Sequence, residues 1–246
     1  MKKTYQRYAA LLGLALASAQ AQAVDFAFTS VTGTLTDALS GLTVTASAWS
    51  GTATGNPFES ATLSYSANGL GVFSSGENKQ ANNADALSNK SATELVLFSF
   101  SSAVSLQSLV TYQAGKDSDL NLWAGTGAFS PSGLLPSALP GSAAQFDNSV
   151  NTNGIRTVDL STFTGSYDWL AISARLAQSD DFVKLTSLAV TPVAQPVPDA
   201  ATFDASLSAY TDKLDKIATG EIAMQTLRSE KDALRVEDWL EIDRYA

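Results

Sequence analysis

The chain has 246 residues, with 24 Asp and Glu against 15 Lys and Arg, a formal net charge of −9 at pH 7, and neither histidine nor cysteine. The missing histidine excludes an ordinary Ser-His-Asp triad, and the absence of both residues excludes disulfides and the usual zinc site. Few clustered Lys and Arg argue against nucleic acid or an anionic membrane as partner, because both are held by such clusters. The function classes that this composition allows are carboxylate chemistry, binding of hard cations and surface recognition.

The N-terminus has the pattern of a secretory signal peptide. A basic start is followed by an apolar run over 9–19 and by the small-x-small triplet Ala21-Gln22-Ala23. The apolar run is shorter than the roughly 20 residues that cross a bilayer. We therefore expect 1–23 to be cleaved and the mature protein to be exported without a transmembrane segment.

Residues 24–192 are predicted to form one domain of antiparallel strands. Short runs rich in Val, Thr, Leu, Phe and Ser alternate with Gly, Asn and Ser turns, which is typical of strands. This pattern predicts a mainly β fold, a jelly-roll-like antiparallel β-sandwich, followed by an α-helical tail. The expected strands are 26–34, 42–49, 61–66, 70–74, 94–99, 104–112, 120–124, 156–160, 169–175 and 182–191.

Three segments of this domain carry more specific expectations. The nearly continuous apolar run 94–100 indicates a central strand, whereas 105–109 alternates imperfectly and is expected to be half exposed. Three prolines and several Gly and Ser residues within 124–153 predict a long surface loop.

A set of motifs in the domain resembles a known family. They are Gly69-Leu70-Gly71-Val72, Gly76-Glu77, Asn82-Asn83 with Asp85, the run 94–100 with Val104-Ser105-Leu106, Asp117-Ser118-Asp119-Leu120, Trp123-Ala124-Gly125-Thr126-Gly127, Asp181-Phe182-Val183-Lys184-Leu185 and Val190-Thr191-Pro192-Val193. Over about 24–198 the chain resembles the exosortase-dependent surface proteins, exported PEP-CTERM-type β-sandwich proteins of Gram-negative bacteria. The resemblance implies a cell-surface or biofilm-matrix protein that is not an enzyme.

The C-terminal part departs from that family. Its members carry a Val-Pro-Glu-Pro motif, an apolar helix and a basic cluster, whereas this chain reads Val197-Pro198-Asp199-Ala200 and continues without the helix or the cluster. We expect a linker over 193–202. Direct secretion is the expected route, and exosortase sorting of a chain whose gene end was recombined or frameshifted remains the alternative.

The charged segment 203–246 is predicted to be a helical tail. Apolar residues recur every three or four positions from Phe203 to Ile217, which places them on one helical face, and a second helix is expected over 221–239. The tail either covers its own domain or binds a partner or a second copy, so the oligomeric state is left open.

One loop is the first candidate for a metal site. Glu77, Asn83 and Asp85 lie between two expected strands, and their oxygen-rich composition suits Ca²⁺. Asx turns explain the same residues without a metal. The run Asp117-Ser118-Asp119 resembles a fragment of an EF-hand loop, but the Gly and the closing Glu are missing, so we expect a hairpin-like turn with solvated carboxylates.

Two other kinds of site are weighed against ordinary packing. Glu59, Glu77 and Glu94 could serve a glycosidase by residue type, but no spacing joins two of them in one site. Trp49, Trp123 and Trp169 could stack on sugars, although burial is the commoner fate of such residues.

These observations favour a non-enzymatic exported protein with a structural or adhesive role, located outside the cell or on the surface of a Gram-negative bacterium. Exopolysaccharide or other surface proteins are its expected partners. The alternative is a calcium-assisted carbohydrate-binding module.

Overall fold

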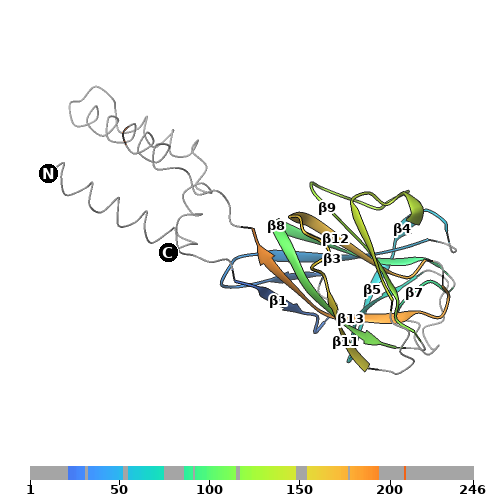
Figure 1. Ribbon diagram of the computed structural model, residues 1–246. Coiled ribbons are helices and arrows are strands. Elements are labelled where there is room, and N and C mark those ends of the chain that lie inside the picture. Colours follow the sequence, from blue (N-terminus) through green and yellow to red (C-terminus); the bar gives the residue numbers. More distant parts are fainter. Residues whose placement is uncertain are drawn as a thin grey trace, which may run out of the picture. The chain divides into compact units, whose positions relative to one another are not determined.

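A computed structural model describes residues 22–30, 33–51, 55–74, 86–90, 92–114, 117–147, 154–176, 178–193 and 208. Residues 22–193 form one compact unit (Figure 1). The expected signal peptide, except for its last two residues, and the expected tail, except for Ser208, lie outside the described residues. None of the helices within the described ranges is long and apolar enough to cross a membrane.

The described part is almost entirely antiparallel β-structure with one short 3-10 helix, Pro136–Ala138. The strands are β1 (Val24–Ala27), β2 (Thr34–Thr36), β3 (Thr43–Gly51), β4 (Phe58–Ser60), β5 (Thr62–Ser66), β6 (Gly69–Phe73), β7 (Leu87–Ser88), β8 (Glu94–Gln113), β9 (Leu120–Gly125), β10 (Ser142–Phe146), β11 (Gly154–Asp159), β12 (Tyr167–Ala174) and β13 (Phe182–Pro192).

The long strand β8 belongs to both layers of the fold. Its first half pairs with β3 and β12, and its second half pairs with β11 and β13 (Figure 1). One layer therefore runs β10-β9-β12-β8-β3, and the other is β11-β8-β13 with β1, β6 and β7 also paired to β13. A strand that passes from one sheet to the other makes the corner of a β-sandwich. The expected antiparallel β-sandwich is confirmed.

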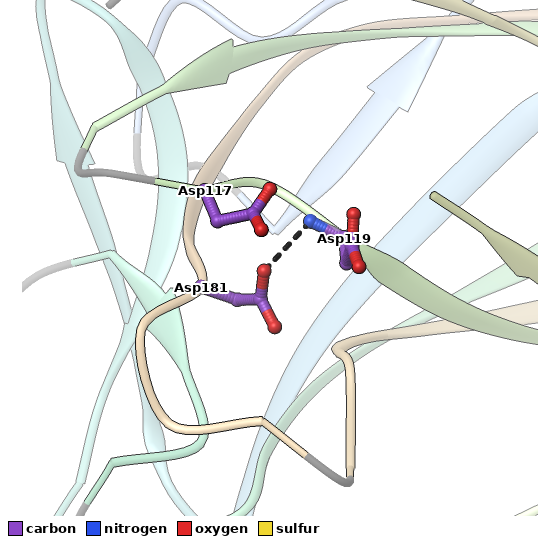
Figure 2. Close-up of side chains that lie close together, drawn as sticks. All are labelled: Asp117, Asp119 and Asp181. Atoms are coloured by element: carbon purple, nitrogen blue, oxygen red, sulfur yellow. Dashed lines mark hydrogen bonds between the residues drawn. The ribbon is translucent and has the colours of Figure 1, made fainter. Parts of the chain in front are cut away.

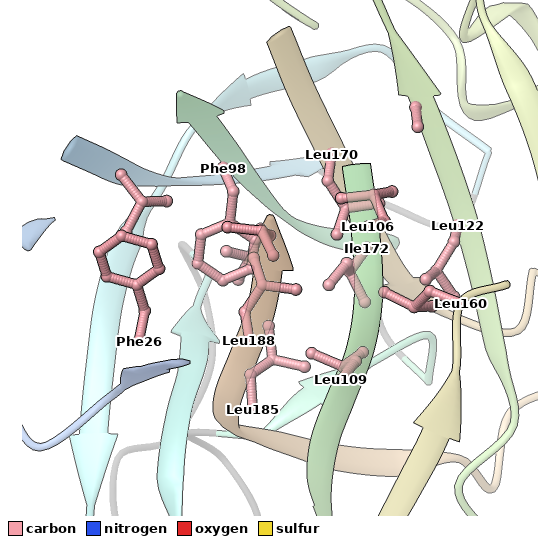
Figure 3. Packing of buried hydrophobic residues seen from close by; sticks show 14 of the residues in the cluster. Phe26, Phe98, Leu106, Leu109, Leu122, Leu160, Leu170, Ile172, Leu185 and Leu188 are labelled. Atoms are coloured by element: carbon pink, nitrogen blue, oxygen red, sulfur yellow. The ribbon is translucent and has the colours of Figure 1, made fainter. Parts of the chain in front are cut away.

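The core lies between the two layers. Phe98 of β8 and Leu170 and Ile172 of β12 face Leu185 and Leu188 of β13 (Figure 3). All five side chains are fully buried. Burial of each such side chain contributes about 1.5–3 kcal/mol, so this interface is the main source of stability in a chain without disulfides.

A second apolar cluster covers the outer face of the first layer. Leu95, Leu97, Trp123 and Trp169 pack there against Phe58 and other residues. Strand β8 is thus apolar on both faces in its first half, which confirms the expected central strand over 94–100.

The segment that follows β9 covers this second cluster. The Phe129 ring stacks on the Trp169 indole with the ring centroids 4.2 Å apart. A Cβ atom at Gly125 or Gly141 would collide with its surroundings, with the Trp169 indole at Gly125 and with the Ala124 carbonyl at Gly141. Glycine at both positions therefore lets the backbone pack directly over the indole.

Seven of the expected strands agree with observed strands to within a few residues: β3, β5, β6, β9, β11, β12 and β13. The expected half exposure of 105–109 is also confirmed, because Gln107 is exposed while Leu106 and Leu109 are buried.

Three expectations about the strands are wrong. The expected strand 26–34 is two strands, β1 and β2, and the expected strands 94–99 and 104–112 are one, β8. The expected surface loop 124–153 contains β10, which pairs along its length with β9. Short polar or small residues at these places resemble turns in the sequence, yet long-range pairing holds the backbone extended.

Candidate functional site

Three aspartates converge where β9 and β13 begin. Asp117 and Asp119 precede β9, and Asp181 immediately precedes β13. Asp117 and Asp181 form an isolated parallel bridge, and the Phe182 backbone nitrogen donates to the Asp117 carbonyl oxygen at 3.2 Å. Backbone pairing therefore brings the three carboxylates together, with one oxygen of each within 4.8 Å of the others (Figure 2). We call these three residues the aspartate cluster.

Two members of the aspartate cluster are buried. Asp119 is 1% exposed and Asp181 is 0% exposed. The backbone nitrogen of Asp119 donates to Asp181 Oδ1 at 2.8 Å. Burial raises the pKa of Asp181 to about 7, and repulsion from Asp119, Asp117 and Asp180 acts in the same direction, although the hydrogen bond from Asp119 opposes it. Burial likewise raises the pKa of Asp117.

Positive charge near the aspartate cluster is unevenly placed. One guanidinium nitrogen of Arg175 lies 2.7 Å from Asp119 Oδ2 and 3.3 Å from Asp147 Oδ2. Among the described residues, no Lys or Arg lies within ion-pair distance of Asp117 or Asp181. Within the described part of the chain, Asp117 and Asp181 therefore form no ion pair of their own, although the charge of Arg156 also acts on Asp117.

A second arginine holds the backbone of the aspartate cluster. Arg156 of β11 donates to the carbonyl oxygen of Ser118 at 3.1 Å and to its hydroxyl at 2.7 Å. Ser118 is fully buried between the two aspartates. Arg156 thus fixes the segment that carries Asp117 and Asp119.

The amide of Gln178 adds a fourth polar group. With its nitrogen toward the carboxylates, it donates to Asp119 Oδ2 at 2.9 Å and to Asp181 Oδ2 at 3.2 Å. Turned by half a rotation, the same amide presents an oxygen to the same point. Gln178 can therefore stabilise the metal-free cluster through its amide nitrogen, or offer its amide oxygen as a ligand to a cation.

The donor set of the aspartate cluster fits a hard divalent cation. Ca²⁺ binds about six to eight oxygen ligands at about 2.3–2.6 Å, so two ligands of one ion lie at most about 5 Å apart. The carboxylate spacing of 4.8 Å or less satisfies that limit. Only oxygen donors are present, which suits Ca²⁺ better than metals that prefer nitrogen or sulfur.

Only part of the sequence-predicted site lies within the described residues. Glu77, Asn83 and Asp85 lie outside the described residues. The expected solvated turn at Asp117-Ser118-Asp119 is wrong, because Ser118 and Asp119 are buried by pairing with a segment 62 residues further along the chain. Sequence reasoning missed Asp181 as a site residue, since a single aspartate before a strand has no local signature.

The candidate glutamates do not form a common site among the described residues. Ser50 of β3 pairs with Glu59 of β4 on one side and with Glu94 of β8 on the other. Glu94 is 1% exposed, and its Oε2 accepts from the Ser88 backbone nitrogen at 2.8 Å, whereas Glu59 is exposed. Glu77 lies outside the described residues.

The tryptophans pack in the outer cluster. Trp123 is 7% exposed and Trp169 is 3% exposed, so the expected core packing is confirmed for both. Trp49 is half-buried against the same cluster, and its indole nitrogen donates to the Ser47 hydroxyl at 2.9 Å.

A depression lies at the other end of β9 and β12 from the aspartate cluster. Its volume is about 470 Å³, and its lining includes Thr126, Phe129, Ser142, Tyr167 and Trp169. Ligand sites usually have volumes of roughly 300–1,000 Å³ and aromatic walls with a few polar groups. The aspartate cluster and the depression are therefore two separate candidate sites on one domain.

No protein-family model matches the chain, and no curated protein matches it. Among solved structures, the family 32 CBM of NanJ from C. perfringens, in complex with galactose, is 10% identical over 69% of this chain and 91% of that chain, with a TM-score of 0.27. GH31 CBM32-2 bound to GalNAc is 8% identical over 72% of this chain and 100% of that chain, with a TM-score of 0.25. Similarity at this level carries no argument about function.

Proposed function

We propose that the chain is an exported, non-enzymatic protein of the cell surface or extracellular matrix, and that its β-sandwich is a scaffold or adhesive module stabilised by a bound calcium ion. One observation carries the calcium proposal: the carboxylates of Asp117, Asp119 and Asp181 converge within 4.8 Å, and among the described residues Asp119 is the one member of the three that forms an ion pair. A divalent cation would relieve that repulsion, because it attracts all three carboxylates at once.

The physical consequence is a stability that depends on calcium. A ligand that binds only the folded state stabilises it in proportion to the logarithm of its concentration above Kd. The mature protein should therefore melt at a higher temperature in millimolar calcium than in a chelator.

The test compares the wild-type protein with two isosteric variants. Asp181→Asn removes a charge from the aspartate cluster, while Asp159→Asn removes one from an exposed residue on β11. We expect calcium to raise the Tm of the wild type and of D159N and to leave D181N nearly unchanged. Equal melting curves with calcium and chelator in the wild type would refute the proposal.

Carbohydrate binding is the second candidate function, and the depression beside Trp169 favours it. Phe129 is half-buried at its wall, so part of an aromatic face remains available for a sugar ring. Thr126 and Ser142 supply hydroxyls on the same lining. Binding of exported polysaccharide or of an arrayed glycan, lost in Phe129→Ala, would support this function; no binding by the folded wild type would reject it.

Export and membership of the exosortase-dependent surface proteins are parts of the same proposal. N-terminal sequencing of the protein recovered outside the cell should begin at Val24. Its surface retention with and without the host exosortase distinguishes sorting from direct secretion, and measurable glycoside turnover would contradict the non-enzymatic role.

A further inference from the structure

A buried amide, that of Asn89, contacts the turn that carries two neighbours of the aspartate cluster. Asn89 directly follows β7 and is 3% exposed. Its Nδ2 donates to three backbone carbonyl oxygens, those of Arg175 at 3.0 Å, Leu176 at 2.7 Å and Gln178 at 3.3 Å. The Thr93 hydroxyl donates to Asn89 Oδ1 at 2.9 Å, which fixes the orientation of the amide.

The same turn is held from β9. The Leu176 backbone nitrogen donates to Asn121 Oδ1 at 2.9 Å, and the Arg175 backbone nitrogen donates to the Asp119 carbonyl oxygen at 3.1 Å. The N–H groups of Arg175 and Leu176 are therefore bonded to Asp119 and Asn121, the Gln178 N–H donates to the Arg175 carbonyl oxygen, and all three carbonyl groups accept from Asn89. We call these three residues the 175–178 turn.

The side chains of the 175–178 turn reach the aspartate cluster. Arg175 pairs with Asp119, and the Gln178 amide contacts both Asp119 and Asp181. The backbone position of the turn thus sets how closely Arg175 pairs with the charge of Asp119. It also sets whether the Gln178 amide oxygen can reach a cation bound by the aspartate cluster. Asn89 acts on the aspartate cluster through this turn.

We infer that Asn89 is a positioning residue, and that its side-chain NH₂ group sets the cation affinity of the aspartate cluster by holding the 175–178 turn. The inference rests on the proposed calcium site. Three carbonyl oxygens that converge on one point repel one another, and the amide between them offsets that repulsion by donating to all three. Loss of the amide protons should therefore release the turn, even when the side chain keeps its size.

Isothermal titration of the mature full-length protein with calcium tests the inference. Asn89→Ala removes the amide, and Asn89→Asp keeps its shape but replaces the donor by an acceptor. We expect calcium to bind at least about tenfold more weakly to both, in the range seen when residues that orient metal ligands are changed.

Two control variants separate positioning from general destabilisation. Val44→Ala opens a cavity at β3, which pairs there with Phe100 at the end of the first layer away from the aspartate cluster. Asn68→Asp makes the same amide-to-carboxylate change as Asn89→Asp at an exposed residue between β5 and β6. We expect Val44→Ala to lower Tm without changing calcium affinity, and Asn68→Asp not to weaken binding.

Amide hydrogen exchange in chelator gives a readout that does not depend on calcium. Asn89→Ala should speed exchange at the Arg175 and Leu176 amides more than Val44→Ala does. A wild-type calcium affinity together with wild-type exchange in Asn89→Ala would overturn the inference. If the wild type binds no calcium, the proposed calcium role fails, and faster exchange in Asn89→Ala still supports the positioning of the turn.

Discussion

Asp181 accepts a hydrogen bond from the backbone nitrogen of Asp119, 62 residues earlier, although both side chains carry carboxylates and both are buried. This contact joins the starts of two strands from different layers of the sandwich. It also places Asp181, whose pKa is raised to about 7, against two other carboxylates.

Asp181→Asn is expected to stabilise the protein in chelator at about pH 8. The amide removes the repulsion within the aspartate cluster, and its oxygen still accepts from Asp119. The gain should be on the order of 1–2 kcal/mol, because one unit of pKa corresponds to about 1.4 kcal/mol and solvent screens part of the effect. Denaturant unfolding with Asp159→Asn as control measures it; a loss of stability in D181N alone would contradict the repulsion.

Stability in chelator should fall as pH rises toward and through 7. The pKa of Asp181 is about 7 in the folded protein, against about 3.9 for an unperturbed aspartate, so the folded state holds its proton more tightly. The stabilisation is complete below about pH 4 and is lost as Asp181 ionises. Denaturant titrations between about pH 5 and about pH 8 should show this slope in the wild type and a smaller slope in D181N.

Arg175→Gln should make stability more dependent on calcium. Without the guanidinium, buried Asp119 loses its ion pair, which destabilises the metal-free protein. The same change removes the positive charge that competes with calcium for Asp119 and, unlike a change at Asn89, leaves the hydrogen bonds to the 175–178 turn in place, so calcium should bind more tightly. Differential scanning of this variant should show a lower Tm in chelator and a larger rise on adding calcium; a smaller rise would assign Arg175 a supporting role in cation binding.

Gly125→Ala should destabilise the outer apolar cluster by about 1–3 kcal/mol, because the new methyl group collides with the Trp169 indole. Ser161→Ala is the control, since Ser161 is exposed and its backbone nitrogen, which donates to Asp159, is unchanged. Tm and near-UV circular dichroism report the change. Equal Tm values for the two variants would show that the indole can move aside.

Local sequence patterns were sufficient for most of the β-body. Alternating Val, Thr, Leu and Ser residues specify strands because side chains in a strand point to opposite faces, and this local rule located β3, β5, β6 and β9. The apolar run over 94–100 likewise specified a strand covered on both faces. The lack of cysteine by itself excludes disulfides.

Only the tertiary structure decided how these strands are joined and where the charges meet. Ser101 and Ala103 resemble a turn, but pairing on both sides keeps β8 continuous across the corner of the sandwich. The aspartate cluster likewise depends on a pairing between Asp117 and Asp181 that no local pattern encodes. Strand propensity acts over neighbouring residues, whereas register and convergence depend on which distant segments pack together.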